Sequence, residues 1–146
     1  QINYDGTRAA DRDFKLAVNA QANAYGLEWG VQGTAGIRTD TAATDGTSID
    51  NAASSAFGLQ AYLHVFAFTG TSVTVTIQES SDNAVGDPFA NVTGGSFTAA
   101  TGITSERIAT ASGLTVERYL RVVTTGTFTN AQFAVNIVRN DTATTF

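Results

Sequence analysis

The feature that most constrains the fold of this sequence is an alternation of apolar and polar residues with a period of two. It is clearest over residues 59–69, where every second position from Leu59 to Ala67 is apolar. Successive side chains of a β-strand point to opposite faces, so this period predicts a strand with one buried face. Phe66 and Phe68 make the other face apolar toward the end of the segment, which predicts a strand covered on both sides there.

The same period predicts further strands, and helix signals are almost absent. We expect Gly70 to turn the chain between 59–69 and 72–79, and a loop over 125–130 to join the strands that flank it. Several strands spaced by turn signals predict an all-β fold, namely an antiparallel β-sandwich or jelly-roll-like domain preceded by an extended N-terminal strand arm. The other expected strands cover residues 14–22, 89–92, 96–99, 106–110, 116–124 and 132–139.

Composition divides the chain into four expected parts. Residues 1–34 are the N-terminal strand arm, with the strand at 14–22 and a shorter candidate at 25–30. Residues 35–56 are almost entirely Thr, Ala, Asp, Gly, Asn and Ser, and we expect a linker or an extended arm because structureless loops of that length are uncommon inside a compact domain. The remaining parts are the β-sandwich domain at 57–140 and a C-terminal tail at 141–146.

Composition also excludes several classes of function. The 146 residues include no Cys, which excludes disulfides, a thiolate nucleophile and a Cys-ligated metal. Lys and Arg number 8 against 13 Asp and Glu, and the net charge of −5 argues against a nucleic-acid partner. No apolar run approaches the roughly 18 residues of a membrane span, and none resembles a signal peptide. Because the chain starts at Gln1 and contains no Met, we expect a processed product or part of a longer chain.

No arrangement of residues in the sequence predicts catalysis. His64 is the single histidine and falls within a strand, and no Ser occupies a G-x-S-x-G elbow. Glu106 and Glu117 could face each other across strands as a glycosidase pair would, but nothing marks a cleft between them. Asp82 and Asp87 offer oxygen ligands for calcium, at a spacing that does not match an EF-hand loop. We therefore predict no catalytic, cofactor-binding or metal-ligating residue.

The arginines of the second half attract attention because only 14% of the residues are charged. Arg118 and Arg121 differ in strand parity, so they lie on opposite faces and do not form one basic stripe. We expect these arginines to pair with glutamates across strands rather than to bind an anion. The arginines are Arg107, Arg118, Arg121 and Arg139, and the glutamates are Glu79, Glu106 and Glu117.

Aromatic residues leave a second kind of function open. Carbohydrate-binding sandwiches stack sugars on exposed Trp and Tyr, and Trp29, Tyr62 and Tyr119 are available here. Trp29 falls outside the expected sandwich, and packing in the core is the simpler explanation for most of the rings. A carbohydrate-binding module therefore stays open as an alternative.

Several segments resemble the C-terminal β-sandwich module of bacteriophage major tail proteins. They are 62–83 (YLHVFAFTGTSVTVTIQESSDN), 97–101 (FTAAT), 106–110 (ERIAT), 118–128 (RYLRVVTTGTF) and 133–135 (FAV). Residues 14–22 and 25–30 are similar to the segment that joins this module to a tail-tube domain. The resemblance covers most of residues 25–140, and it implies that residues 1–34 are the end of a tube-like domain.

The resemblance implies a non-enzymatic structural protein of a bacteriophage virion, most of all a tail or tail-tube protein. We expect a homo-oligomer that assembles through the strand arm and the sheet edges into a ring, tube or capsid-surface layer, in contact with other virion proteins. No cofactor, nucleic acid or membrane is expected as a partner, and a surface glycan stays open. The alternatives are a capsid decoration protein, a carbohydrate-binding β-sandwich module and, more remotely, a glycosidase-like enzyme.

Overall fold

The computed structural model describes residues 2–8, 14–20 and 28–143, which form an all-β protein. Neighbouring strands are antiparallel, and this confirms the predicted sandwich-like class. In this part of the chain no helix is long and apolar enough to cross a membrane. The strands are β1 (Ile2–Arg8), β2 (Phe14–Ala20), β3 (Val31–Gln32), β4 (Arg38–Asp40), β5 (Thr44–Asp45), β6 (Ile49–Asp50), β7 (Leu59–Ser80), β8 (Ala90–Ser96), β9 (Thr104–Ala109) and β10 (Tyr119–Arg139).

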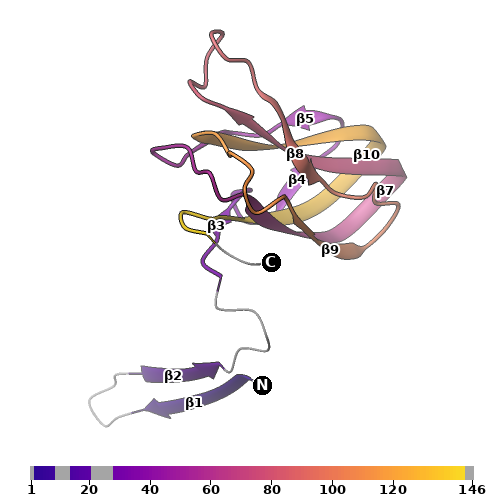
Figure 1. Cartoon of the computed structure of the whole chain (residues 1–146). Helices are drawn as coiled ribbons and strands as arrows, with labels where there is room; N and C mark the ends of the chain where they lie inside the picture. Colours follow the sequence, from indigo (N-terminus) through magenta and orange to yellow (C-terminus); the bar gives the residue numbers. More distant parts are fainter. Residues whose placement is uncertain (1, 9–13, 21–27, 144–146) are drawn as a thin grey trace.

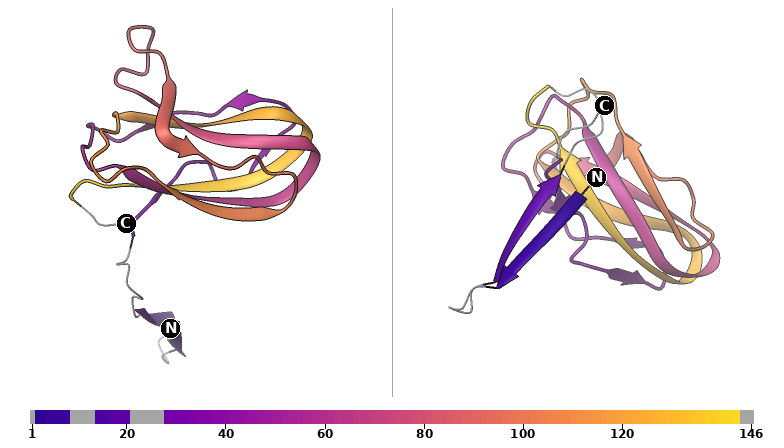
Figure 2. Two further views of the ribbon diagram at one scale, coloured as in Figure 1. Left: turned by 45° about the vertical axis from the view of Figure 1, so that its right-hand side comes forward. Right: turned by 90° about the horizontal axis from the view of Figure 1, so that it is seen from below.

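The scaffold of the sandwich is the pair formed by β7 and β10, which run antiparallel along their full length. The register starts with Ser80 opposite Tyr119 and ends with Leu59 opposite Arg139. Both strands bend near their middle, so the ribbon curls over and its two halves become the two layers of the sandwich (Figure 1, Figure 2). Side chains from both halves meet in one hydrophobic core.

Two further segments complete an eight-stranded sheet, one on each side of the β7–β10 pair. On one side, β3, β4, β5 and β6 follow one another along β10. On the other side, β9 and β8 lie along β7. The layer that holds the first half of β7 therefore also contains β3, β4 and β9, and the other layer contains β5, β6 and β8.

The expectation of a structureless linker over residues 35–56 is wrong, because β4, β5 and β6 fall within it and pair with β10. These strands are only two or three residues long, so no alternating pattern develops in the sequence. Of the short strands predicted later in the chain, those at 89–92 and 106–110 correspond to β8 and β9. The one predicted at 96–99 is not a separate strand.

Bulges explain how the long strands bend and still keep apolar residues inside. Phe66 and Thr71 on β7 and Thr129 on β10 are extra residues without a partner in the register. Each extra residue reverses which positions face the core. β7 contains two extra residues, so the two reversals cancel and odd-numbered positions face the core at both of its ends. β10 contains one extra residue, so its core-facing positions change from even-numbered to odd-numbered along the strand. The main core residues of these strands are Leu59, Leu63, Val65, Val73, Val75 and Ile77 on β7, and Leu120, Val122, Ala131, Phe133, Val135 and Ile137 on β10.

The bulge at Phe66 also explains why both faces of 59–69 become apolar in the sequence. The unpaired Phe66 is 47% exposed, whereas Phe68 returns to the inner face and packs against the core. The prediction that this end of the strand is covered on both sides is therefore wrong. The apolar run reflects a change of parity at the bulge.

The chain breaks expected at Gly70 and at 125–130 are also wrong, because β7 and β10 continue through them. Gly126 has a φ of +119°, and a Cβ there would lie 2.4 Å from the carbonyl oxygen of Ser72 on the facing strand. A Cβ on Gly70 would similarly lie 2.4 Å from Cα of Phe128. Glycine inside a strand allows such a close approach of two backbones, and here it marks a bend rather than a turn.

The N-terminal strands β1 and β2 form a separate two-stranded sheet in which Ile2 lies opposite Ala20 and Arg8 opposite Phe14. β2 corresponds to the strand predicted at 14–22, whose last two residues lie outside the described part of the chain. Residues 25–27 of the candidate at 25–30 also lie outside it, and residues 28–30 are not in a strand.

Gly126→Ala should destabilise the fold, because its Cβ would meet the Ser72 carbonyl oxygen at a φ that L-residues rarely adopt. We expect a loss of about 2 kcal/mol or more in the free energy of unfolding, measured by urea denaturation. Gly102→Ala is the matched control, since nothing lies within 4 Å of its Cβ position. Equal stability of the two variants would contradict the close approach at the bend.

Candidate functional site

The outer face of one layer carries a row of side chains from three adjacent strands. Asn136 of β10 lies opposite Tyr62 of β7, and Tyr62 lies opposite Arg107 of β9. Residues directly opposite each other in a sheet point to the same side. The row therefore presents an amide, a phenol and a guanidinium side by side, with the aromatic ring in the centre.

The segment 28–30 crosses this row on its way into β3. At one end the carboxylate of Glu28 accepts a hydrogen bond from Tyr62 and lies 3.7 Å from the guanidinium of Arg107. At the other end Gly30 lies flat against Asn136, since an added Cβ would be 2.3 Å from the amide nitrogen of that side chain. The sequence did not identify this cluster, because Glu28 belongs to a segment that was expected to lie outside the sandwich.

The hydroxyl of Tyr62 joins the two charged groups. It donates to Glu28 and accepts from Nε of Arg107 at 3.1 Å, and the guanidinium lies 5.7 Å from the centre of the Tyr62 ring. Burial raises the pKa of Tyr62, and the hydrogen bond to Glu28 raises it further. The phenol therefore keeps its proton at neutral pH and holds Glu28 and Arg107 in place.

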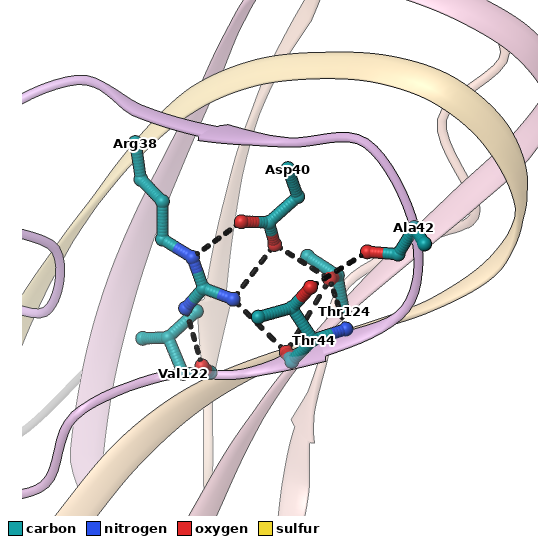
Figure 3. Close-up of polar contacts among 6 residues, drawn as sticks. All are labelled: Arg38, Asp40, Ala42, Thr44, Val122 and Thr124. Atoms are coloured by element: carbon teal, nitrogen blue, oxygen red, sulfur yellow. Dashed lines mark hydrogen bonds and ion pairs between the residues drawn. The ribbon is translucent and has the colours of Figure 1, made fainter.

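A second cluster fastens the two layers to each other at the β4 edge (Figure 3). Nε and Nη2 of Arg38 donate to the two carboxylate oxygens of Asp40 at 2.8 and 2.7 Å. Nη1 of Arg38 donates to the Val122 carbonyl at 2.8 Å, and the Thr124 hydroxyl donates to Asp40 at 2.6 Å. Val122 and Thr124 belong to the first half of β10, whereas β4 pairs with the second half. These bonds therefore span the bend of the sheet. Asp40 is 4% exposed, so the pair is largely shielded from water.

An open groove of about 510 Å³ lies beside this cluster, lined by residues between Gln32 and Ile49. Arg38 contributes to the lining, but its guanidinium already binds Asp40 and the backbone carbonyls of Val122 and Thr44. The Arg38 guanidinium in this groove therefore holds the edge of the sheet together.

Aspartates of the edge segment are also the partners of two other arginines. Arg118 binds Asp50 through two hydrogen bonds of 2.7 Å, and these bonds lower the pKa of Asp50 to about 2. Arg121 lies 3.0 Å from Asp45. The expected glutamate partners of these arginines are therefore wrong, because residues 44–50 form an edge of the sheet beside β10 rather than a linker. The remaining arginine, Arg139, pairs with Asp141.

The two glutamates considered as a glycosidase pair belong to separate clusters. The carboxylate of Glu106 accepts hydrogen bonds from the amide and hydroxyl of Thr98, at 2.9 and 3.0 Å. Glu117 lies instead beside Glu79 and Asp87, and its amide donates to Glu79 at 2.9 Å. Burial raises the pKa of Glu79, and burial together with repulsion from Asp87 raises the pKa of Glu117.

The acidic loop after β7 binds its own backbone. Asp82 accepts the amide of Ala84 at 2.8 Å, and Asp87 accepts the amide of Ser81 at 2.6 Å, which lowers the pKa of Asp87. Among the described residues no group of three or more His, Asp or Glu is placed to hold a metal ion. His64 lies on the exposed outer face of β7, and its ring stacks on Phe66 with the centroids 6.4 Å apart.

The fold and these surface clusters define a protein of the antiparallel β-sandwich class. No family model, curated protein or solved structure matches the chain.

Asp40→Ala should cost about 3 kcal/mol in the free energy of unfolding, because it leaves the Arg38 guanidinium without its carboxylate partner at a largely buried position. Asp141→Ala is the matched control, since it removes an aspartate that pairs with Arg139 and is 76% exposed. We expect that variant to lose less than about 1 kcal/mol. Chemical denaturation measures both, and equal losses would show that the buried contacts of Asp40 with Arg38 and Thr124 do not stabilise the fold.

Glu79→Gln should raise stability at neutral pH relative to the original chain. The folded pKa of the Glu79 carboxyl lies above its ordinary value of 4.5. Such a group stabilises the fold fully at pH values below 4.5, and this contribution is lost as the pH rises through the raised pKa. Glutamine removes this loss, so the two proteins should differ at neutral pH and converge below pH 4.5. Urea denaturation over a pH series measures the difference, and parallel profiles would contradict it.

Proposed function

We propose that this chain is a non-enzymatic structural subunit of a bacteriophage virion, a tail protein that self-associates through its N-terminal hairpin and its sheet edges. The observation that carries self-association is the β1–β2 sheet, whose strands have no other strand partner in the described part of the chain. A two-stranded hairpin alone is marginally stable in water at best. It therefore needs another surface to cover it, and a neighbouring copy in an assembly offers one.

The register of the hairpin supports this requirement. Tyr4 lies opposite Val18, and Gly6 lies opposite Leu16. Because residues alternate between faces along each strand, the large apolar positions of both strands fall on one face of the hairpin. That face holds Ile2, Tyr4, Phe14, Leu16, Val18 and Ala20 together with Gly6 and Arg8, and the opposite face holds Asn3, Asp5, Thr7, Lys15, Ala17 and Asn19.

The sandwich offers a sheet edge that a neighbouring strand could extend. Thr104 to Ala109 form β9, which pairs with β7 through an unbroken register of six residues. Within the described residues β9 has no strand on its other side. An unpaired edge exposes backbone donors and acceptors that a strand from another chain can bind. The opposite edge is built from β3 to β6, which are short and interrupted, and is a poorer template.

The assignment to a phage tail rests on the resemblance of the β-strand segments to the tail module. A capsid decoration protein with the same sandwich would differ in the symmetry of its assembly. Rings or stacked tubes in electron micrographs would support a tail protein. Small closed oligomers that bind only to capsids would support the decoration alternative.

Leu16→Glu should weaken self-association, because it places a charge among the apolar positions of the hairpin. Ala17→Glu is the matched control, since it adds the same charge at the neighbouring position on the opposite face. We expect sedimentation velocity to show oligomers for the original chain and for Ala17→Glu, and a shift of at least tenfold toward monomer for Leu16→Glu. An original chain that stays monomeric at every concentration would overturn assembly through the hairpin.

A further inference from the structure

The backbone of β9 directs part of its hydrogen-bonding groups away from the sheet. The amide of Thr110 donates to the Leu59 carbonyl at 3.0 Å, so the even-numbered positions of β9 bond to β7. Backbone groups alternate in direction along an antiparallel strand, and those of Ser105, Arg107 and Ala109 therefore point toward the outer edge. Among the described strands none lies along that edge.

A hollow with an exposed isoleucine lies beside the same edge. Ile103 directly precedes β9 and is 78% exposed, and it lines an open hollow of about 290 Å³ together with the loop over residues 98–102. Glu106 lines the hollow from the core-facing side of β9, since it lies opposite the buried Leu63. A strand added to β9 would therefore turn one of its faces toward this hollow.

We propose that β1 of a second copy of this chain pairs antiparallel with β9, so that the hairpin extends a layer of its neighbour's sandwich. This inference rests on the self-association proposed above and identifies the two strands that make it. Figure 1 shows the hairpin standing apart from its own sandwich, which leaves the β9 edge to another copy. The apolar face of the hairpin turns inward, toward Ile103 and the hollow, and its polar face stays in water.

Charge selects β1 over β2 and favours one register. β2 carries Lys15 on its polar face and no acidic residue, so it offers no counter-charge to Arg107. In β1, Asp5 lies on the polar face, and it falls opposite Arg107 when residues 3–8 run against β9. Opposite charges across a strand pair stabilise the pairing, and like charges oppose it. Asp5 then shares the guanidinium with Glu28, whose carboxylate lies 3.7 Å from it.

The same register fits the inner face. Tyr4 falls opposite Ile108, and pairs of an aromatic with a β-branched residue stabilise adjacent strands. Gly6 falls opposite Glu106 and leaves room beside its carboxylate, so the diagonal neighbour Arg8 can pair with it. Every residue of β9 therefore gains a partner on the matching face.

The chain contains no Cys, so engineered disulfides report on this register alone. Thr7 falls opposite Ser105, and directly opposite residues lie within reach of a disulfide. Thr7→Cys and Ser105→Cys are made in separate chains, mixed and oxidised, and mass spectrometry should find a dimer with one chain of each kind. Asn3→Cys mixed with Ser105→Cys is the matched control, on the same strand and face but out of register. We expect the control to give at least about tenfold less of the mixed dimer.

Ser105→Pro tests the edge without changing the core. Proline lacks an amide hydrogen, and the Ser105 amide points away from β7, so the bonds between β7 and β9 are kept. We expect an unfolding midpoint close to that of the original chain, and a shift of at least about tenfold toward monomer in sedimentation velocity.

The possible outcomes separate this pairing from self-association in general. Oligomers of the original chain that give no Thr7–Ser105 disulfide would overturn the pairing of β1 with β9 and leave the proposed self-association in place. An original chain that is monomeric at every concentration would overturn both. A chain carrying both cysteines that links them internally, and never to another chain, would overturn the second copy as the partner. A folded Ser105→Pro variant that stays oligomeric would overturn the β9 edge as the docking site.

Discussion

The antiparallel pairing of β7 with β10 is the interaction on which the rest of the structure depends. Each strand exceeds 20 residues, and the pair contributes to both layers, so a single ribbon supplies the centre of the whole sandwich. The two layers stay in contact because bulges and close glycine contacts let the ribbon bend while its two strands stay paired. The remaining strands of the main sheet pair either with β10 on one side of this ribbon or with β7 on the other.

The sequence predicted the strands well and their continuity poorly, for one physical reason. Alternation identifies extended backbone, but a bulge residue reverses the parity and looks like the end of a strand. Gly70 and Gly126 carry the same turn signal whether the chain reverses or merely bends. Only the facing strand distinguishes the two cases, since Phe128 and Ser72 occupy the space that a side chain would need.

The edge formed by residues 31–50 could not be predicted because its pairing with β10 is brief and its side chains are mostly polar. Backbone pairing with β10 holds it in place, and contacts of Asp40, Asp45 and Asp50 with side chains near them support that pairing. Aspartates that alternate with Thr, Ala, Gly and Ser predict a polar linker rather than a sheet edge. Their partners lie between 2 and 76 positions away in the sequence, since Arg38 is close to Asp40 and Arg121 is far from Asp45. The same separation in sequence concealed the cluster of Glu28 with Tyr62 and Arg107.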